Sequence, residues 1–150
     1  MAFLYDLNAD LKEALKSRDE LKVSVIRMIK ASLKNREIEK MNSLSDEEVL
    51  SVLSTLAKQR RESIEQYSAA GRPDLADRES EELEIVYSYM PKQLSASELY
   101  NVIRSAISES GVSSLNEIGK VMKILMPKVK GVADGKIVNQ RIKELLSPAS

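Results

Sequence analysis

The residue types that most often carry chemistry in proteins are missing from this sequence. Its 150 residues include no cysteine and no histidine. Cysteine supplies disulfides, thiolate nucleophiles and sulfur ligands for metals, and histidine is the commonest general base and metal ligand. Disulfides and cysteine-based metal sites are therefore excluded, and any catalysis would depend on carboxylates, lysines, tyrosines and serines.

A run of acidic residues is a candidate site for a divalent metal. It consists of Asp74, Asp77, Glu79, Glu81, Glu82 and Glu84. No histidine and no loop of oxygen ligands accompanies this run, and acids near the start of a helix also complement its dipole. We interpret the run as a helix face exposed to water and predict neither a metal site nor a cofactor.

The serines and glycines also lack a catalytic pattern. Most serines stand at expected helix starts or on helices, where capping explains them, and the five glycines are scattered instead of forming a phosphate-binding loop. A serine–lysine nucleophile pair would need a serine-rich loop in a strained setting. We therefore predict no catalytic centre in this chain, which leaves open an activity within a larger complex.

Basic residues gather in the last third of the chain. The whole chain has no net charge, but residues 119–143 contain seven basic side chains and one acid, Asp134. At about 100° per residue, the polar residues of two predicted helices here fall opposite their apolar residues. The candidate RNA-facing residues are Lys120, Lys123, Lys128, Lys130, Lys136, Asn139 and Lys143.

Turns are expected to separate these two basic helices. The segment 127–131 is predicted to form a short basic connection with exposed amides, and Gly119, Gly131 and Gly135 are predicted turn-forming residues. Lysine charges and backbone N–H groups together suit a phosphate backbone. The alternatives are a lysine-rich surface exposed to water and a cationic face that meets an acidic protein partner.

Earlier basic residues are expected to play a different part. They are Arg27, Lys30 and Lys34, spaced at i, i+3 and i+7, followed by Lys58, Arg60 and Arg61. Residues 1–94 carry a net charge of −3. We therefore predict that these basic residues pair with neighbouring acids, such as Glu37 and Glu62, and keep the surface hydrated.

The apolar periodicity predicts an all-α fold with four helices followed by three. The stripe of the first helix is Leu4, Leu7, Leu11, Ala14 and Leu15. Asp19 is an expected N-cap, and capping boxes are predicted at Ser45 with Glu48, Ser95 with Glu98, and Ser114 with Glu117. Gly71 and Gly111 are expected to end helices.

Pro91 predicts a boundary between two domains. The residue before a proline avoids the α region, so a helix should end at Met90, and the capping box at Ser95 begins another. We predict an N-terminal helical domain at 1–92 and a C-terminal one at 93–150. No apolar run could span a membrane, and Asp6 and Asp10 replace the basic flank of a signal peptide, so we expect a soluble cytoplasmic protein.

Several segments resemble the YqeY family, in one order along nearly the whole chain. They are residues 24–31, 58–63, 72–76, 89–95, 119–122, 126–131 and 133–139. The second half is also similar to the helical tail of the GatB subunit of the glutamine-dependent aminoacyl-tRNA amidotransferase. In that enzyme the tail contacts tRNA, while amide hydrolysis and phosphorylation occur in other domains.

The resemblance implies a small helical N-terminal domain and a three-helix C-terminal domain similar to a tRNA-binding tail. It implies RNA-facing or turn-forming roles for Gly119, Lys120, Lys128, Lys130, Gly131, Lys136 and Asn139. Arg141 departs from the aliphatic residue expected at its place, which suggests a side chain lying along the edge of the core.

The leading expectation is a non-catalytic accessory protein that binds tRNA or another structured RNA. One alternative is a component of a glutamine-dependent carbon–nitrogen ligase complex, with amidotransferase-type subunits as partners. The other is a protein–protein adaptor that uses the basic C-terminal face.

Overall fold

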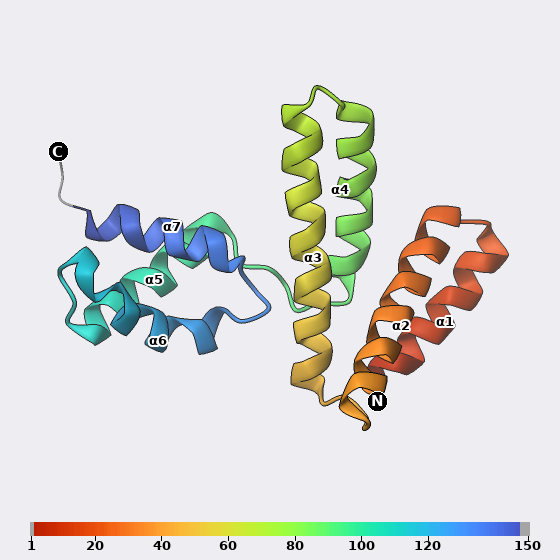
Figure 1. The fold of residues 1–150 in the computed structure, drawn as a ribbon, viewed down its shortest axis with the longest axis horizontal. Helices are drawn as coiled ribbons and strands as arrows, with labels where there is room; N and C mark the ends of the chain where they lie inside the picture. Colours follow the sequence, from red (N-terminus) through yellow and green to blue (C-terminus); the bar gives the residue numbers. More distant parts are fainter. Residues whose placement is uncertain (1, 148–150) are drawn as a thin grey trace. The chain divides into compact units, whose positions relative to one another are not determined.

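Helices make up nearly all of this protein in the computed structural model, which describes the backbone of residues 2–147 and the side chains of residues 7–147. The helices are α1 (Ala2–Ser17), α2 (Glu20–Lys40), α3 (Asp46–Ala69), α4 (Pro73–Ser88), α5 (Ala96–Ser110), a 3-10 helix η1 (Leu115–Glu117), α6 (Ile118–Val129) and α7 (Gly135–Leu146) (Figure 1). The described backbone contains no strand. The predicted all-α fold, with four α-helices followed by three, is therefore confirmed.

The chain divides into two compact units, Met1–Pro91 and Lys92–Ser150. We call them the N-terminal unit and the C-terminal unit. The first contains α1–α4 and the second contains α5–α7 with η1. None of the helices described has the length and apolar character that crossing a membrane requires.

In the N-terminal unit, the hairpin of α3 and α4 packs along its length, and α2 lies against α1 (Figure 1). The core contains Leu7, Val25, Ile26, Ile29, Leu33, Leu53, Leu56 and Val86. At its edge, the Tyr89 hydroxyl donates a hydrogen bond of 2.5 Å to the Asp10 carboxylate. This bond joins the chain just after α4 to α1.

Most helix ends follow the local sequence rules. Asp19 accepts from the Lys22 amide at 3.1 Å, and the capping boxes at Ser45 and Ser95 are both present. Gly71 and Gly111 take φ values of +71° and +70°, the left-handed conformation that suits glycine after a helix.

The capping box predicted at Ser114 is wrong. The Ser114 hydroxyl accepts from the Asn116 amide at 3.3 Å instead of from the amide of Glu117. The chain there forms the short 3-10 helix η1, whose tighter turn brings the second following residue to the cap.

Leu15 was predicted on the apolar stripe of α1, but it is 49% exposed. The neighbouring core positions are Leu7 and Ala14, which are fully and almost fully buried. The side chain of Leu4 lies outside the described residues. The exposure of Leu15 shows that the buried face of α1 is narrower than its apolar stripe.

The C-terminal unit packs α5, α6 and α7 around one core. That core contains Leu99, Ile103, Ala106, Val112, Val121, Leu125, Val129, Val138, Ile142 and Leu146. In α6 the fully buried line is Val121, Leu125 and Val129, with Met122 only partly buried at its side. Each step along this line is four residues, so it follows one face of the helix.

Pro127 does not interrupt α6, contrary to the prediction, and the segment 127–131 is not a connection throughout. The helix continues to Val129, with Pro127 inside it. A proline removes the N–H that would bond to the carbonyl of Lys123, four residues earlier. Pro127 and Lys123 are both exposed, so water can bond to that carbonyl. The helix continues past Pro127 because this places Val129 in the core, and its burial is stabilising.

The residues just before α5 belong to the C-terminal unit through hydrogen bonds to the α6–α7 loop. The Gln93 side-chain amide donates to the Gly131 carbonyl at 2.8 Å, and the Leu94 amide donates to the Val132 carbonyl at 2.8 Å. The loop between α6 and α7 is consequently hydrogen-bonded to the segment that begins the C-terminal unit.

Candidate nucleic-acid interface

The C-terminal unit has a net positive charge. From Lys92 onward the sequence has nine basic and five acidic residues, a net charge of +4, which the N-terminal unit balances with −4. An excess of this kind favours polyanionic partners.

On α6 the basic residues lie on exposed parts of the helix surface, away from Val121, Leu125 and Val129. Lys120 and Lys123 are both exposed, and Lys120 lies 3.8 Å from the Glu117 carboxylate. Among the described side chains Lys123 forms no ion pair. The helix therefore presents two lysines to solvent as the sequence predicted.

Lys128 has a partner that the sequence pattern did not reveal. Its ammonium lies 3.1 Å from the carboxylate of Glu109 on α5, and about half of each side chain is exposed. The two residues are 19 positions apart, so only the packing of α5 against α6 brings them together. The prediction that Lys128 sits on an exposed turn is wrong, because it lies in the last turn of α6.

The loop after α6 uses most of its amides internally. The Lys130 amide donates to the Met126 carbonyl at 3.0 Å, and the amides of Val132 and Ala133 donate to the Val129 carbonyl at 3.0 and 3.1 Å. The prediction of a connection rich in exposed amides is therefore wrong. Lys130 itself is exposed, and it makes a further interaction within the protein.

Of the three glycines predicted to form turns, only Gly131 takes a left-handed conformation, with φ +78°. Gly119 lies in the first turn of α6, and Gly135 is the first residue of α7. A Cβ atom added at either would meet nothing within 4 Å. Gly119 and Gly135 are therefore helical residues, and the prediction that they form turns is wrong.

On α7, Lys136 and Lys143 are exposed while Asn139 between them is half-buried. The Asp134 carboxylate caps this helix by accepting from the Lys136 amide at 3.1 Å. Arg141 pairs with Glu144 at 3.2 Å, with about half of each side chain exposed. Arg141 therefore extends into solvent instead of lying along the core edge.

One feature of this unit was not found from the sequence. The guanidinium of Arg104 lies over the ring of Tyr100, 5.7 Å from its centre, on the exposed side of α5. Tyr100 is 42% exposed. The spacing of i and i+4 between an aromatic and an arginine was the available signal.

Two arginines of α3 contact uncharged groups of the N-terminal unit, which the sequence pattern did not reveal. Arg61 donates to the Tyr87 hydroxyl of α4 at 2.7 Å. Arg60 donates to the Leu56 carbonyl at 3.4 Å and contacts the Met28 sulfur of α2. These two arginines therefore join helices of the N-terminal unit.

Arg27, Lys30 and Lys34 also differ from expectation. Among the described side chains, none of the three forms an ion pair, although Glu37 follows on the same helix. The predicted ion pairs of these three residues are therefore wrong. An acid nearby in the sequence need not approach a flexible basic side chain on an exposed helix face.

The acidic run lies on α4, where Asp74, Asp77, Glu81 and Glu84 are exposed and Glu79 and Glu82 are half-buried. In the described part of the chain, no three potential ligand residues come together to hold a metal ion. Asp74 pairs instead with Arg72 at 3.1 Å. Glu79 is half-buried, and its burial together with the nearby Glu82 carboxylate raises its pKa.

A model of the family described as Yqey-like protein matches residues 4–146. The chain belongs to the YqeY family. The match spans both units, so the N-terminal helices are as much part of the family as the basic C-terminal ones.

Curated relatives of this YqeY-family chain come from yeasts and share the name "Altered inheritance of mitochondria protein 41, mitochondrial". The protein of Vanderwaltozyma polyspora is 38% identical over 85 residues, which are 56% of this chain and 46% of the relative. That of Lachancea thermotolerans is 38% identical over 94 residues, 62% and 50% of the two chains. The matches thus span about half the length of these relatives.

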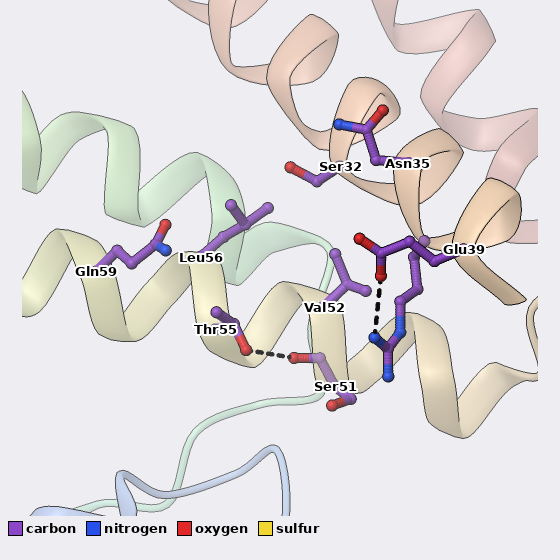
Figure 2. Close-up of a pocket in the computed structure, with 9 residues that line it drawn as sticks. Ser32, Asn35, Glu39, Ser51, Val52, Thr55, Leu56 and Gln59 are labelled. Carbon is purple, nitrogen blue, oxygen red and sulfur yellow. Dashed lines mark hydrogen bonds and ion pairs between the residues drawn. The ribbon is translucent and has the colours of Figure 1, made fainter.

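Figure 2 shows a groove between α2 and α3 of this YqeY-family protein. It has a volume of about 420 Å³ and is lined by small polar side chains such as Ser32, Asn35, Thr55 and Gln59. The Thr55 hydroxyl donates to the Ser51 carbonyl at 3.1 Å. The charged residues of the groove, Arg36 and Glu39, pair with each other at 3.4 Å.

Proposed function

We propose that this YqeY-family protein is a non-catalytic accessory protein that binds tRNA or another structured RNA through its C-terminal unit. The supporting observation is that lysines lie on the exposed sides of two helices whose other sides form the core. Lys120 and Lys123 on α6, and Lys136 and Lys143 on α7, are exposed, while the buried residues of both helices form the core. Lysines placed in this way can contact phosphates without any change of fold.

The ion pairs within this surface do not oppose the proposal. In the pairs Lys120 with Glu117 and Lys128 with Glu109, between 47% and 69% of each side chain is exposed to water. Exposed pairs of this kind contribute roughly 0–1 kcal/mol, so a phosphate can replace the carboxylate at little cost. RNA binding would then use these lysines together with Lys123 and Lys143.

The resemblance to the GatB tail supports a related proposal. In a complex with amidotransferase-type subunits, this chain would supply RNA binding while the other subunits supply the chemistry. Recovery with such subunits in the absence of RNA would favour that role. The cytoplasmic location stays a prediction, since the names of the yeast relatives place those proteins in mitochondria.

The test is a titration of the full chain with tRNA at several salt concentrations. Affinity should fall steeply with added salt, because each neutralised phosphate releases counterions. Lys123→Ala or Lys143→Ala should each reduce the magnitude of the salt slope by roughly one and weaken all RNA sequences about equally.

Lys58→Ala is the matched control, since Lys58 is an exposed lysine of the N-terminal unit. It should leave both affinity and slope unchanged. Binding that ignores salt, or that survives loss of both Lys123 and Lys143, would overturn the proposal.

A further inference from the structure

Three large apolar side chains are exposed in the described part of the N-terminal unit, and they lie near the two ends of α2. Leu15 at the end of α1 is 49% exposed, Ile38 on α2 is 63% exposed, and Met41 just after α2 is 90% exposed. Ile38 follows Arg27 by 11 residues, so the two lie on the same side of α2. Leu15 lines a cavity with Arg27 near the start of α2, so exposed apolar groups flank both ends of this helix, and a partner lying along it would cover them.

The same face is hollowed. One cavity of about 520 Å³ lies between α1 and α2 and is lined by Leu15, Val23, Ser24 and Arg27, among others. A second, of about 350 Å³, is lined by Lys30, Ala31 and Lys34 further along α2. The lining positions recur every three or four residues, so the two cavities follow one line along the helix. We call this line, from Leu15 to Met41, the α2 face.

Basic residues outnumber acidic ones along the α2 face. Arg27 and Lys34 are exposed, Lys30 is half-buried, and among the described side chains none of them forms an ion pair. Elsewhere in this unit, Arg36 pairs with Glu39, and Arg72 pairs with Asp74. The two cavities are lined by four basic residues, Arg18, Arg27, Lys30 and Lys34, and by two acids, Glu20 and Glu37, so the face is net positive in a unit whose net charge is −4.

We propose that the α2 face binds one acidic amphipathic helix of a partner protein. The line of residues from 20 to 37 is about 27 Å long, which matches five turns of a helix. Carboxylates of the partner would meet Arg27, Lys30 and Lys34, and its apolar residues would cover the ends at Leu15, Ile38 and Met41. Ser24 and Ala31 are small, so a second helix can approach closely.

Two other occupants fit this face less well. The phosphates of RNA would use the cations but leave three exposed apolar side chains uncovered. A second copy of this chain offers Asp77, Glu81 and Glu84 on the exposed face of α4, but no large apolar residue stands among them. The combination of charge and apolar surface therefore favours a helix that carries both leucines and glutamates.

The test uses the full chain and a synthetic 18-residue peptide whose leucines and glutamates share one helical face. Two matched peptides serve as controls, one with the same composition in permuted order and one with lysine in place of glutamate. Fluorescence anisotropy should show at least tenfold weaker binding of both controls, because each lacks one half of the required pattern.

Variants of the chain place the binding on the α2 face. Arg27→Glu with Lys34→Glu should weaken the acidic peptide at least tenfold. Lys58→Glu with Arg78→Glu makes the same charge change at exposed positions of α3 and α4 and should alter binding less than twofold. Ile38→Ser with Met41→Ser should also weaken binding severalfold, although it changes no charge. Circular dichroism checks that helicity is kept.

Three outcomes would overturn the proposal. The first is equal binding of the acidic and permuted peptides, and the second is equal loss in the two charge-changed variants. The third is that Arg27→Glu with Lys34→Glu abolishes tRNA binding or a concentration-dependent dimer. Either result would show that the α2 face binds RNA or a second copy of the chain. The RNA proposal above concerns the C-terminal lysines and is tested separately by Lys123→Ala.

Discussion

Glu79 on α4 is a carboxyl group in an unfavourable setting for its charge. Burial raises its pKa above the ordinary value of 4.5, and the carboxylate of Glu82 one turn later acts in the same direction. Arg60 and Arg78 oppose this rise. Folding therefore favours the protonated form of Glu79 relative to the unfolded chain.

This setting predicts a pH dependence of stability. A raised pKa contributes stability that is present below pH 4.5 and is lost as pH rises through the folded value. Glu79→Gln removes the charge, so relative to the parent it should be more stable at pH 7 than at pH 4. Urea unfolding midpoints at both pH values measure the difference. Glu81→Gln, at an exposed position, is the control and should show a smaller pH-dependent difference.

The capping box that begins α5 is an element whose stability depends on two side chains. The Ser95 hydroxyl accepts from the Glu98 amide at 3.2 Å, and the Glu98 carboxylate accepts from the Ser95 amide at 3.1 Å. The second bond lowers the pKa of Glu98. Its contribution is therefore present above pH 4.5 and is lost as pH falls through the lowered value.

Ser95→Ala should destabilise the C-terminal unit by about 1 kcal/mol, because one amide at the helix start loses its acceptor. Ser105→Ala, an exposed change within α5, should not destabilise, since alanine is the better helix former. Chemical denaturation followed by circular dichroism compares the two. Equal loss of stability in both variants would contradict a capping role for Ser95.

Pro127 gives a second prediction at the level of an element. Pro127→Ala should stabilise α6 by about 1–3 kcal/mol, because it restores an amide donor for the Lys123 carbonyl and removes the clash of the ring. Thermal unfolding should shift to higher temperature. A shift to lower temperature would mean that the ring contributes packing that outweighs the recovered hydrogen bond.

The whole molecule is expected to behave as two separable units. Gln93 and Leu94 are bonded to the α6–α7 loop, which leaves Pro91 and Lys92 as the exposed residues between the units. Trypsin under limiting conditions should therefore cleave first after Lys92 and leave two helical fragments. Initial cleavage within α3 would show that the N-terminal unit is the less stable region.

The isolated chain should not hydrolyse glutamine or transfer its amide to aminoacyl-tRNA. The sequence contains neither cysteine nor histidine, and most of its serines cap helices or lie on them, so we expect no activated nucleophile. A glutaminase assay on purified protein measures this. Turnover above background that is abolished by one substitution in this chain would reveal an active site.

The sequence by itself determined the helices and most of their ends, because these depend on residues within four positions of one another. The caps at Asp19, Ser45 and Ser95, and the left-handed glycines after two helices, follow such local rules. The basic character of the last third was equally visible, since charge is a property of composition.

Only the tertiary structure decided which side chains meet. Lys128 pairs with Glu109, and Arg61 donates to Tyr87 across 26 residues. The same packing left Leu15 exposed beside an unpaired Arg27, although both lie in regular helical patterns. Contacts of this kind depend on how helices far apart in the chain lie against one another, and helical periodicity gives only the face of each helix.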